Sequence, residues 1–410
     1  MEGPSLSRDL STTVVVAGGG PAGMMCGYLL ARAGIAVTVL EKHKDFLRDF
    51  RGDTVHPSTL QALSDLGLLA DFLKLRHEEY DQLEAELGNR RFKFADFRKL
   101  PTVCKFVAFV PQWDFLDFLA ERGRALANFR LLMETEATGL VRKGGTVAGV
   151  EAKDAHGNFT IAATLVVAAD GRNSRMREAA GFEVEDLGAP MDVLWFRLEP
   201  EEGDAPAAFG RITEDGMIVR FFRGDYWQCA YIIRKGSLAE LKADGLQAFR
   251  ATVARLARRK NADEIGSWDD VKLLTVAVDR LPRWHLPGLL FIGDAAHAMS
   301  PIGGVGINLA VQDAIAAANI LARPLKTGRL RARDLSAVRR RRWFPTWAMQ
   351  KIQTTMQNIA IDPILSARRV PPAPFVLKLA QRWPFLRRIP ARIVGMGFRP
   401  ERPDKNLFTI

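Results

Sequence analysis

Residues 13–23 read Thr-Val-Val-Val-Ala-Gly-Gly-Gly-Pro-Ala-Gly, a β-branched apolar run followed by a glycine-rich turn. The run 13–17 has the length and composition of a buried parallel strand, and residues 21–33 have the pattern of a helix. A second apolar run, 36–40, ends at Glu41. The order strand, turn, helix, strand predicts a βαβ unit, which indicates an α/β domain beginning here.

The glycines of this turn, Gly18, Gly20 and Gly23, have the G-x-G-x-x-G spacing of a dinucleotide-binding turn. The first permits a tight turn, the second lets backbone approach a pyrophosphate, and the third lets the helix pack closely on the strand. The helix N-terminus adds amide donors and a positive dipole. Glu41, at the end of the second strand, is placed to accept hydrogen bonds from ribose hydroxyls. Because an acid there disfavours a 2′-phosphate, the pattern predicts FAD or NAD rather than NADP.

Two further motifs follow later apolar runs and complete a recognisable order. They are Asp170-Gly171-Arg172 after residues 164–169, and Gly293-Asp294 after residues 289–292, continuing to Pro301-x-Gly303-Gly304-x-Gly306-x-Asn308. With the glycine turn, over about residues 14–320, the chain resembles the flavoprotein monooxygenases of the para-hydroxybenzoate hydroxylase type. That superfamily includes the ubiquinone-ring hydroxylases.

The resemblance implies FAD as the cofactor and gives roles to individual residues. Asp294 would bind ribose or ribityl hydroxyls, and Pro301 would lie over the flavin ring. The glycine-rich turn would bring bare backbone and a helix N-terminus to the pyrimidine end of the flavin, where negative charge develops on reduction. The implied cofactor-binding residues are Gly18, Gly20, Gly23, Glu41, Arg51, Gln112, Asp170, Asp294, Gly306 and Asn308, and the turn beside the reacting ring is Pro301, Gly303 and Gly304.

The resemblance also implies the reaction. NAD(P)H would reduce the flavin, oxygen would add to form a flavin peroxide, and its terminal oxygen would hydroxylate an apolar aromatic or quinol-like substrate. Since the cofactor carries this chemistry, the protein needs no certain acid or base. His297 belongs to the Gly-Asp motif and is more typical of local packing than of a general base, and we expect a structural role for His56. No cluster has metal-ligand spacing, so no metal site is expected.

The order of elements predicts a discontinuous Rossmann-like FAD-binding domain, an inserted antiparallel β-sheet substrate domain and a C-terminal helical segment. The expected divisions are 1–76, 105–182 and 273–325 for FAD, 77–104 and 183–272 for substrate, and 326–410 for the helical segment. Residues 190–235 contain short alternating strands rich in aromatic residues, most of which we expect in the sheet core. No Lys or Arg cluster is evident there, so a small, neutral, apolar substrate is favoured.

Positive charge is concentrated at the end of the chain. Of the 410 residues, the last 88 carry 20 Lys and Arg against 4 Asp and Glu, whereas the whole chain has a net charge of +11. Arginines beside Trp343 and Trp383 suit an anionic membrane surface as partner of 323–410. The alternative is a basic helical face that packs its aromatic residues against the flavin domain. Nucleic acid is not expected, because it would require a second, unrelated role.

Membrane-spanning segments are not expected, because the uncharged runs 10–31 and 295–312 are interrupted by glycine and proline. Three widely separated cysteines indicate a reducing compartment. We therefore expect a cytoplasmic enzyme, with peripheral attachment to the inner face of the membrane as the accompanying hypothesis. Two alternative functions stay open: a flavin-dependent reductase of isoprenoid double bonds, and a non-enzymatic flavin-bearing membrane-associated protein. The motifs also leave the oligomeric state and the choice between NADH and NADPH open.

Overall fold

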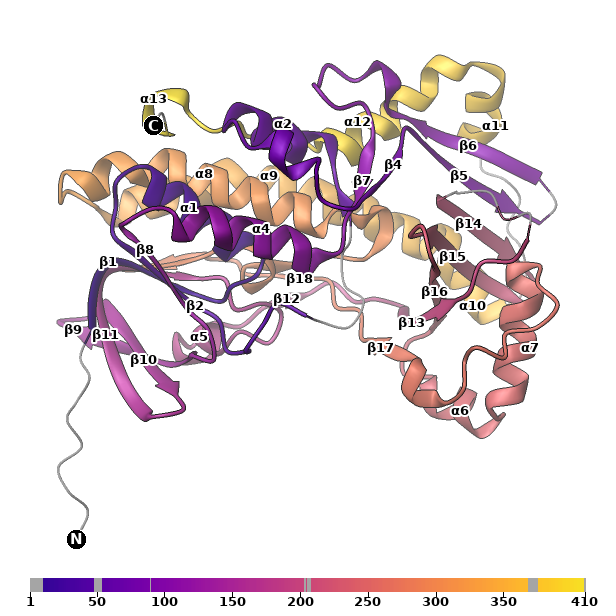
Figure 1. Ribbon diagram of the computed structural model, residues 1–410, viewed down its shortest axis with the longest axis horizontal. Helices are drawn as coiled ribbons and strands as arrows, with labels where there is room; N and C mark the ends of the chain where they lie inside the picture. Colours follow the sequence, from indigo (N-terminus) through magenta and orange to yellow (C-terminus); the bar gives the residue numbers. More distant parts are fainter. Residues whose placement is uncertain are drawn as a thin grey trace, which may run out of the picture.

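The computed structural model describes residues 10–47, 54–88, 90–202, 204, 208–367 and 375–408, and its largest sheet contains the glycine-rich turn (Figure 1). The strands of this sheet are β1 (Leu10–Ala17), β2 (Val37–Leu40), β8 (Phe129–Leu132), β9 (Glu136–Lys143), β10 (Thr146–Asp154), β11 (Gly157–Ala168), β19 (His285–Leu286) and β20 (Leu289–Phe291). Their order is β19-β20-β11-β1-β2-β8, and the hairpin of β9 and β10 extends from β11. The four pairings from β20 to β8 are parallel.

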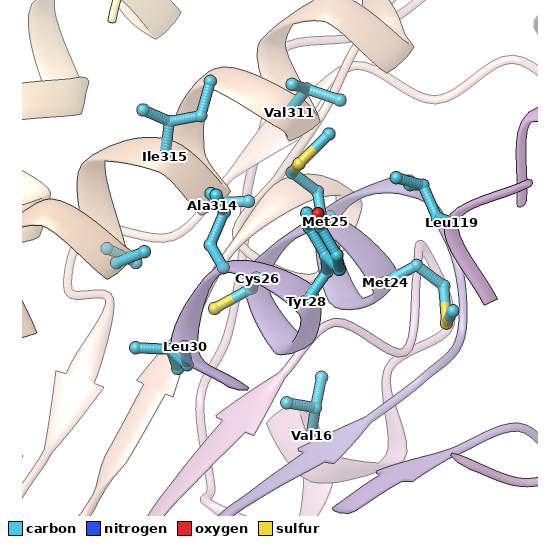
Figure 2. Packing of buried hydrophobic residues seen from close by; sticks show 14 of the residues in the cluster. Val16, Met24, Met25, Cys26, Tyr28, Leu30, Leu119, Val311, Ala314 and Ile315 are labelled. Carbon is cyan, nitrogen blue, oxygen red and sulfur yellow. The ribbon is translucent and has the colours of Figure 1, made fainter. Parts of the chain in front are cut away.

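The helix after the glycine-rich turn is the centre of the core on one face of this sheet. It is α1 (Pro21–Arg32), with proline at its first position, and its side chains are almost all buried. Figure 2 shows these side chains between Val16 of β1 and Val311, Ala314 and Ile315 of α8 (Gly306–Lys326). A third helix, α4 (Gln112–Arg124), packs on α1 from another side. The βαβ unit predicted from residues 13–41 is therefore present.

The second large sheet lies at the other end of the molecule (Figure 1). Its strands, in spatial order, are β17 (Lys272–Leu274), β13 (Met191–Leu198), β16 (Trp227–Arg234), β15 (Gly216–Phe222), β14 (Ala208–Thr213), β5 (Gln82–Leu87) and β6 (Arg90–Asp96). All neighbours are antiparallel except β14 and β5, which are parallel. The two sheets and the helices confirm the predicted fold class.

The helices of this second unit differ from what the local sequence pattern predicts. Residues 238–259 have the pattern of a single helix, but the chain forms α6 (Leu238–Ala243) and α7 (Leu246–Ala257). Gly245 lies between them with a φ of +90°, a conformation that ends a right-handed helix. The break turns α7 back so that it covers one face of the sheet.

Two small sheets and several short helices connect the large units. The small sheets consist of β3 (Thr54–Val55), β7 (Val107–Phe109) and β4 (Glu78–Tyr80), and of β12 (Glu185–Asp186), β18 (Asp279–Arg280) and β21 (His297–Ala298). The short helices and helical turns are α2 (Pro57–Asp65), α3 (Leu69–Phe72), η1 (Phe97–Lys99), α5 (Arg175–Ala179), η2 (Trp268–Asp270), η3 (Gly293–Ala295) and η4 (Ile302–Gly304). The turns at 293–295 and 302–304 both belong to the last of the three predicted cofactor motifs, Gly293–Asn308.

The C-terminal residues contribute to the core and are not an appended tail. Helix α9 (Ala332–Met356) runs alongside α8 and buries one of its faces (Figure 1). After it come a π-helical turn (Gln357–Ile361), α10 (Asp362–Ala367), α11 (Phe375–Arg382), η6 (Pro384–Arg387), α12 (Arg388–Met396) and α13 (Lys405–Phe408). Helix α9 packs through Leu335 and Val338 against the unit formed by the first large sheet with α1, α4 and α8, called the flavin unit below because the resemblance implies FAD there. The aromatic residues Trp343, Phe344 and Trp347 of α9 are exposed, so the packing of aromatic residues expected in one of the two interpretations is not found for α9.

One helical stretch in the described part of the chain, Ile302–Lys326, is long and apolar enough to cross a membrane. Within the protein, 83% of its apolar window is buried. The burial shows that this stretch, mainly α8, is the central helix of the flavin unit.

A buried ion cluster joins α8 to α9. The carboxylate of Asp313 lies 2.9 Å from Nε of Arg342 and 2.6 Å from Nε2 of His297, and none of the three is more than 1% exposed. Burial alone would raise the pKa of Asp313, but His297 and Arg342 outweigh it and hold the pKa below its ordinary value. Arg342 also lies 3.8 Å from Glu401, which follows α12. The cluster therefore fastens the C-terminal helices to the flavin unit.

We expect Asp313→Asn to lower the free energy of unfolding by about 3 kcal/mol at pH 7, because it removes the nearer of the two carboxylates that compensate the buried charge of Arg342. Urea denaturation measures the loss. Since the pKa of Asp313 is lower in the folded protein, its stabilising effect is present above the unfolded-state pKa of about 3.9 and is lost as the pH falls further. The difference between wild type and variant should therefore shrink towards pH 3.

Glu240→Gln is the matched control, because Glu240 pairs with Arg234 at the surface, with side chains 70% and 58% exposed. Exposed pairs contribute at most about 1 kcal/mol. Equal losses for the two variants would contradict the role given to Asp313.

Candidate active site

The glycine-rich turn has the geometry of a pyrophosphate cradle. Gly18 has a φ of +105°, and a Cβ atom there would lie 2.4 Å from the carbonyl oxygen of Ala169. A Cβ atom on Gly23 would lie 1.9 Å from the carbonyl oxygen of Gly18, so only glycine allows α1 to pack this closely on the turn. At Gly20 nothing lies within 4 Å of the corresponding position. The bare backbone at the start of α1 thus faces open space.

Glu41 follows β2 and points back at this turn. Its Oε2 atom accepts a hydrogen bond of 3.2 Å from the Gly19 amide, and its Oε1 atom accepts one of 3.0 Å from the His43 amide. The carboxylate is largely buried. These bonds hold the acid beside the glycines, at the position expected for a ribose partner.

Asp170 forms hydrogen bonds within the turn that follows it. Its carboxylate accepts hydrogen bonds from Ser174 Oγ at 2.6 Å and from the Met176 amide at 3.0 Å, at the start of α5. Burial raises the pKa of Asp170 above its ordinary value, against the opposing effect of these hydrogen bonds. The residue therefore shapes the 170–177 turn, which follows β11 at the same edge of the sheet as the glycine-rich turn.

Asp294 is linked to that same turn. Nε of Arg172 lies 3.0 Å from Oδ2 of Asp294, and both side chains are partly exposed. Arg177 donates to the carbonyl oxygen of Ala295 at 3.3 Å. A Cβ atom on Gly293 would lie only 2.8 Å from the side chain of Ala22 in α1. The structure thus brings the three motifs together at the carboxyl ends of β1, β11 and β20, where ligands bind in open α/β sheets.

The turn after Pro301 is held by hydrogen bonds from β3 and from the residue that precedes α2. The Gly304 carbonyl oxygen accepts hydrogen bonds from Thr54 Oγ1 at 2.8 Å and from His56 Nε2 at 3.0 Å. Gly303 and Gly304 have φ values of +78° and +63°, which favour glycine. At Gly306, the first residue of α8, nothing lies within 4 Å of a Cβ position. A second helix N-terminus therefore presents bare backbone to open space.

Asn308 is fixed one turn into α8. Its Oδ1 atom accepts hydrogen bonds from Ser58 Oγ at 2.5 Å and from Thr59 Oγ1 at 2.9 Å. Both donors belong to α2, which lies against α8. Sequence analysis did not single out these two hydroxyls, because nothing in the chain pattern brings residues 58 and 308 together.

The two histidines near the site are structural. Burial lowers the pKa of His56 to about 4, against the opposing effect of its hydrogen bond to the Gly304 carbonyl. His56 is therefore neutral at pH 7, and it donates from Nε2 because its partner is a carbonyl oxygen. His297 is held by Asp313 within the buried ion cluster. Neither ring is placed as an exposed base, as expected from the sequence.

Two predicted cofactor residues remain to be placed. Arg51 lies outside the described residues. Gln112 is the first residue of α4, next to Pro111, which lines an open recess described below. Within the described ranges there is no group of three or more His, Cys, Asp or Glu side chains able to hold a metal ion.

The second large sheet has two different faces. Phe196, Trp227 and Tyr231 pack with α7, as expected for sheet core. Trp195 lies in a cluster on the opposite face that includes Ile302, next to Pro301. The apolar residues of that face are Met191, Val193, Ala230 and Ile232, with Trp195, Met217, Val219 and Leu274 partly buried beside them. The flavin-side turn therefore lies against an apolar sheet face.

A recess with a volume of about 230 Å³ opens where the two units meet, somewhat smaller than a typical small-molecule site. Its lining residues are Arg76, His77, Glu78, Phe109, Pro111, Trp113, Asp114, Arg197, Arg223, Asp225 and Tyr226. The guanidinium of Arg197 lies 4.4 Å from the centre of the Tyr226 ring. The sequence pattern gives no sign of this group of arginines, because its members are more than a hundred residues apart or lie on different strands and loops.

The residues present fit FAD. Two helix N-termini, at Gly20 and Gly306, offer free amide groups without side chains in front of them, which suits a pyrophosphate and the pyrimidine end of a flavin. Glu41 and Asp294, beside the first and the last of these motifs, supply carboxylates of the kind that accept hydrogen bonds from sugar hydroxyls.

Comparison with known proteins agrees with this geometry. Residues 11–351 match the model of the family described as FAD binding domain. The chain is 33% identical over 416 residues to 6-methylpretetramide 4-monooxygenase from Streptomyces rimosus, which covers 97% of this chain and 95% of that protein. It is 25% identical over 335 residues to digeranylgeranylglycerophospholipid reductase from Methanocella arvoryzae, covering 79% and 80%.

The solved structure of OxyS anhydrotetracycline hydroxylase from Streptomyces rimosus has the same fold, with a TM-score of 0.75 and 21% identity over 94% of this chain and 76% of that chain. The match to a monooxygenase is both longer and closer than the match to the reductase. The chain belongs to the FAD binding domain family and is an FAD-dependent monooxygenase of the aromatic-hydroxylase type.

Proposed function

We propose that the chain hydroxylates an aromatic compound of the polyketide kind, such as 6-methylpretetramide, with NAD(P)H as electron donor and O2 as oxygen source. The observation that carries this proposal is the 33% identity to 6-methylpretetramide 4-monooxygenase over 97% of the chain. When bound, FAD accepts a hydride from the nicotinamide, and its reduced form activates oxygen. The protein's own residues bind, orient and shield the reactants.

We propose that FAD lies across the carboxyl ends of β1, β11 and β20. Gly18, Gly20 and Gly23 would hold the pyrophosphate, and Glu41 and Asp294 would hold sugar or ribityl hydroxyls. The amides of Gly306 and Asn308 would approach the pyrimidine ring, beside Pro301, Gly303 and Gly304. Supporting this placement, Gly20 and Gly306 both have open space above their Cα atoms. Arg51, Gln112 and Asp170 complete the proposed set.

We place the substrate beside the Pro301 turn, next to the partly buried Trp195 of the apolar sheet face. This placement divides the chain as the sequence suggests, with 77–104 and 183–272 for substrate, 1–76, 105–182 and 273–325 for FAD, and 326–410 as a helical segment. The nearby recess adds Arg197 and Arg223, which suits acidic hydroxyl groups at one edge of an otherwise apolar substrate. The three cysteines are free and buried, which supports a cytoplasmic enzyme.

Substitution of two glycines tests the placement of FAD. Gly20→Val should leave the apoprotein folded, since Gly20 has a φ of −73° and open space around it. It should weaken FAD binding by about 100-fold, the loss of roughly two hydrogen bonds to a charged group. Gly23→Ala is the contrasting variant and should destabilise the fold by about 3 kcal/mol through the clash with Gly18. Fluorescence titration with FAD and thermal melting measure the two effects, and undiminished FAD binding by Gly20→Val would refute the placement.

Isotope incorporation tests the reaction. The purified chain with FAD, NADPH, 6-methylpretetramide and labelled O2 should yield a product that has gained one labelled oxygen atom, detected by mass spectrometry. A reductase of isoprenoid double bonds would instead add two hydrogen atoms and no oxygen. A flavin-bearing protein without enzymatic activity would oxidise no NADPH beyond a control without substrate. NADH in place of NADPH shows which donor is used.

We further propose peripheral attachment to the inner face of the membrane through the C-terminal surface. There, Trp383, Phe385 and Ile389 are 48%, 60% and 58% exposed. Helices α11 and α12 lie on β6 at the edge of the substrate sheet (Figure 1). The whole surface consists of Arg382, Trp383, Phe385, Arg388, Ile389 and Arg392, and residues 382–392 contain no acid. Aromatic residues among cations suit the headgroup region of an anionic bilayer.

Vesicle co-sedimentation tests this surface. The chain should bind vesicles that contain phosphatidylglycerol and should not bind pure phosphatidylcholine, and added salt should weaken the binding. Replacing Arg382, Arg388 and Arg392 with Gln should weaken it on the order of 100-fold, at about 1 kcal/mol per arginine. Val103→Ser, at an exposed apolar residue elsewhere, is the control. Equal binding by the arginine variant would exclude this surface as the attachment site.

A further inference from the structure

One face of α9 and of the turn after it carries a row of buried polar side chains. Arg342, Thr346, Gln350, Gln353 and Gln357 recur at three- and four-residue spacing, which places them on one side of a helix. None is more than 1% exposed. Glutamine is mostly found at protein surfaces, so three consecutive buried glutamines on one face require polar partners.

Their partner is the loop that carries Pro301. The Gln353 amide nitrogen donates to the carbonyl oxygens of Ser300 and Ile302, both at 2.9 Å. Its carbonyl oxygen accepts a hydrogen bond of 3.2 Å from the Ser300 amide. Gln357 donates to Ser300 Oγ at 2.9 Å. Because Gln353 faces two acceptors and one donor, the orientation of its amide is determined, and the residues on both sides of Pro301 are tied to α9.

The row continues to the earlier part of the same loop. Gln350 donates to the carbonyl oxygens of Asp279 at 2.7 Å and Ala298 at 3.0 Å. About two turns further back, Arg342 reaches Asp313, whose carboxylate also accepts from the Gly293 amide at 3.1 Å. Helix α9 therefore contacts the loop directly at Ala298, Ser300 and Ile302 and is linked to its beginning at Gly293 through Asp313 of α8.

The opposite side of the turn faces the second large sheet, beside the proposed substrate site. Ile302 packs in the apolar cluster of that sheet face together with Ile361, the last residue of the π-helical turn. A π-helical turn widens the helix locally and is frequent at functional positions. It lies where the face of the helix changes from polar, against the loop, to apolar, against the sheet. The Pro301 turn is thus held between a helix and a sheet.

An apolar row would fill the same space but would leave the loop's amide and carbonyl groups without partners. Buried backbone groups are nearly always paired, and this loop has few hydrogen bonds of its own, such as that from the Gly304 amide to the Pro301 carbonyl oxygen at 3.0 Å. The glycines at 303 and 304 add freedom to the backbone. Without the amides of α9, the backbone groups of Ser300 and Ile302 would lose these partners, and the turn would be held mainly at Gly304, by Thr54 and His56.

We propose that Gln350, Gln353 and Gln357 are positioning residues that hold the Pro301 turn in one position relative to the flavin ring and to the second large sheet. The proposal rests on the placement of FAD given above. The three glutamines bind only the protein loop, and they act on the reaction through the position of Pro301.

Hydrogen exchange of the apoprotein tests this without cofactor or substrate. Gln353→Leu keeps the approximate volume and removes three hydrogen bonds. The amides of residues 293–304 should then exchange about 10-fold faster, while peptides of β1 and α1 keep their wild-type rates. Lys351→Leu, an exposed position on the other side of the same helix, should change neither. Acceleration no greater than in Lys351→Leu, or equal acceleration in β1 and α1, would overturn the proposal.

The flavin signal supplies a second measurement. With FAD bound at saturation, Gln353→Leu should change the visible circular dichroism of the flavin and the rate at which oxygen reoxidises the chemically reduced protein, whereas Lys351→Leu should leave both unchanged. An unchanged flavin signal together with fast exchange would show that the loop does not touch the ring, and would overturn the proposal. Failure of FAD to bind the wild type would refute the proposed function alone, since the apoprotein result stands independently.

Two less disruptive substitutions test the proposal if the Gln353→Leu variant does not fold. Gln357→Leu removes the hydrogen bond from Gln357 to Ser300 Oγ, and Ser300→Ala removes this bond together with the 3.4 Å bond from the Ile302 amide to the same oxygen. If Gln357 acts on the turn only through Ser300, the double variant should accelerate exchange of residues 293–304 no more than Ser300→Ala alone. Additive acceleration would show that the two side chains act separately and would contradict the proposal.

Discussion

The carboxylate of Asp313 has no exposed surface, and the architecture of the site depends on how its charge is compensated. One oxygen faces Arg342 of α9, and the other accepts from His297 and from the amide that follows β20. An isolated charge at this depth would be strongly unfavourable. The end of a sheet strand, the central helix α8 and the first C-terminal helix must therefore meet at one point, which fixes the frame for the glycine-rich turns.

Much of the flavin unit could be predicted from the sequence, because its signals are local. The βαβ unit, the hairpin over Lys143, Gly144 and Gly145, and the helix after Gly306 each follow from periodicity and turn residues within a short stretch. Gly18 and Gly23 have the tight turn and the close helix contact that their spacing predicts. The roles of Glu41, Asp170 and Asp294 towards the cofactor stay predictions.

The remaining features depend on contacts between distant residues. The helix expected over 238–259 is broken because Gly245 takes a left-handed conformation, a choice that periodicity alone does not reveal. The recess is lined by arginines from positions 76, 197 and 223. The hydroxyl groups that donate to Asn308 belong to Ser58 and Thr59, which precede it by 250 and 249 residues. The charge of the C-terminal segment predicts its basic surface. It does not predict that the glutamines of α9 are buried, because glutamine is common on exposed helix faces and its partners here are distant in the sequence.

The parallel pair of β14 and β5 has a consequence for how the protein reaches this state. One edge of β5 stays unpaired until residues 208–213 have been synthesised and have formed β14. Likewise, one edge of β1 stays unpaired until β11 has been synthesised. The ion cluster that closes the flavin unit needs Arg342. Because loop closure over such separations is slow, a ribosome-bound nascent chain exposes open strand edges for most of its synthesis. The enzyme therefore completes its folding only after nearly the whole chain has left the ribosome, and until then depends on protection from aggregation.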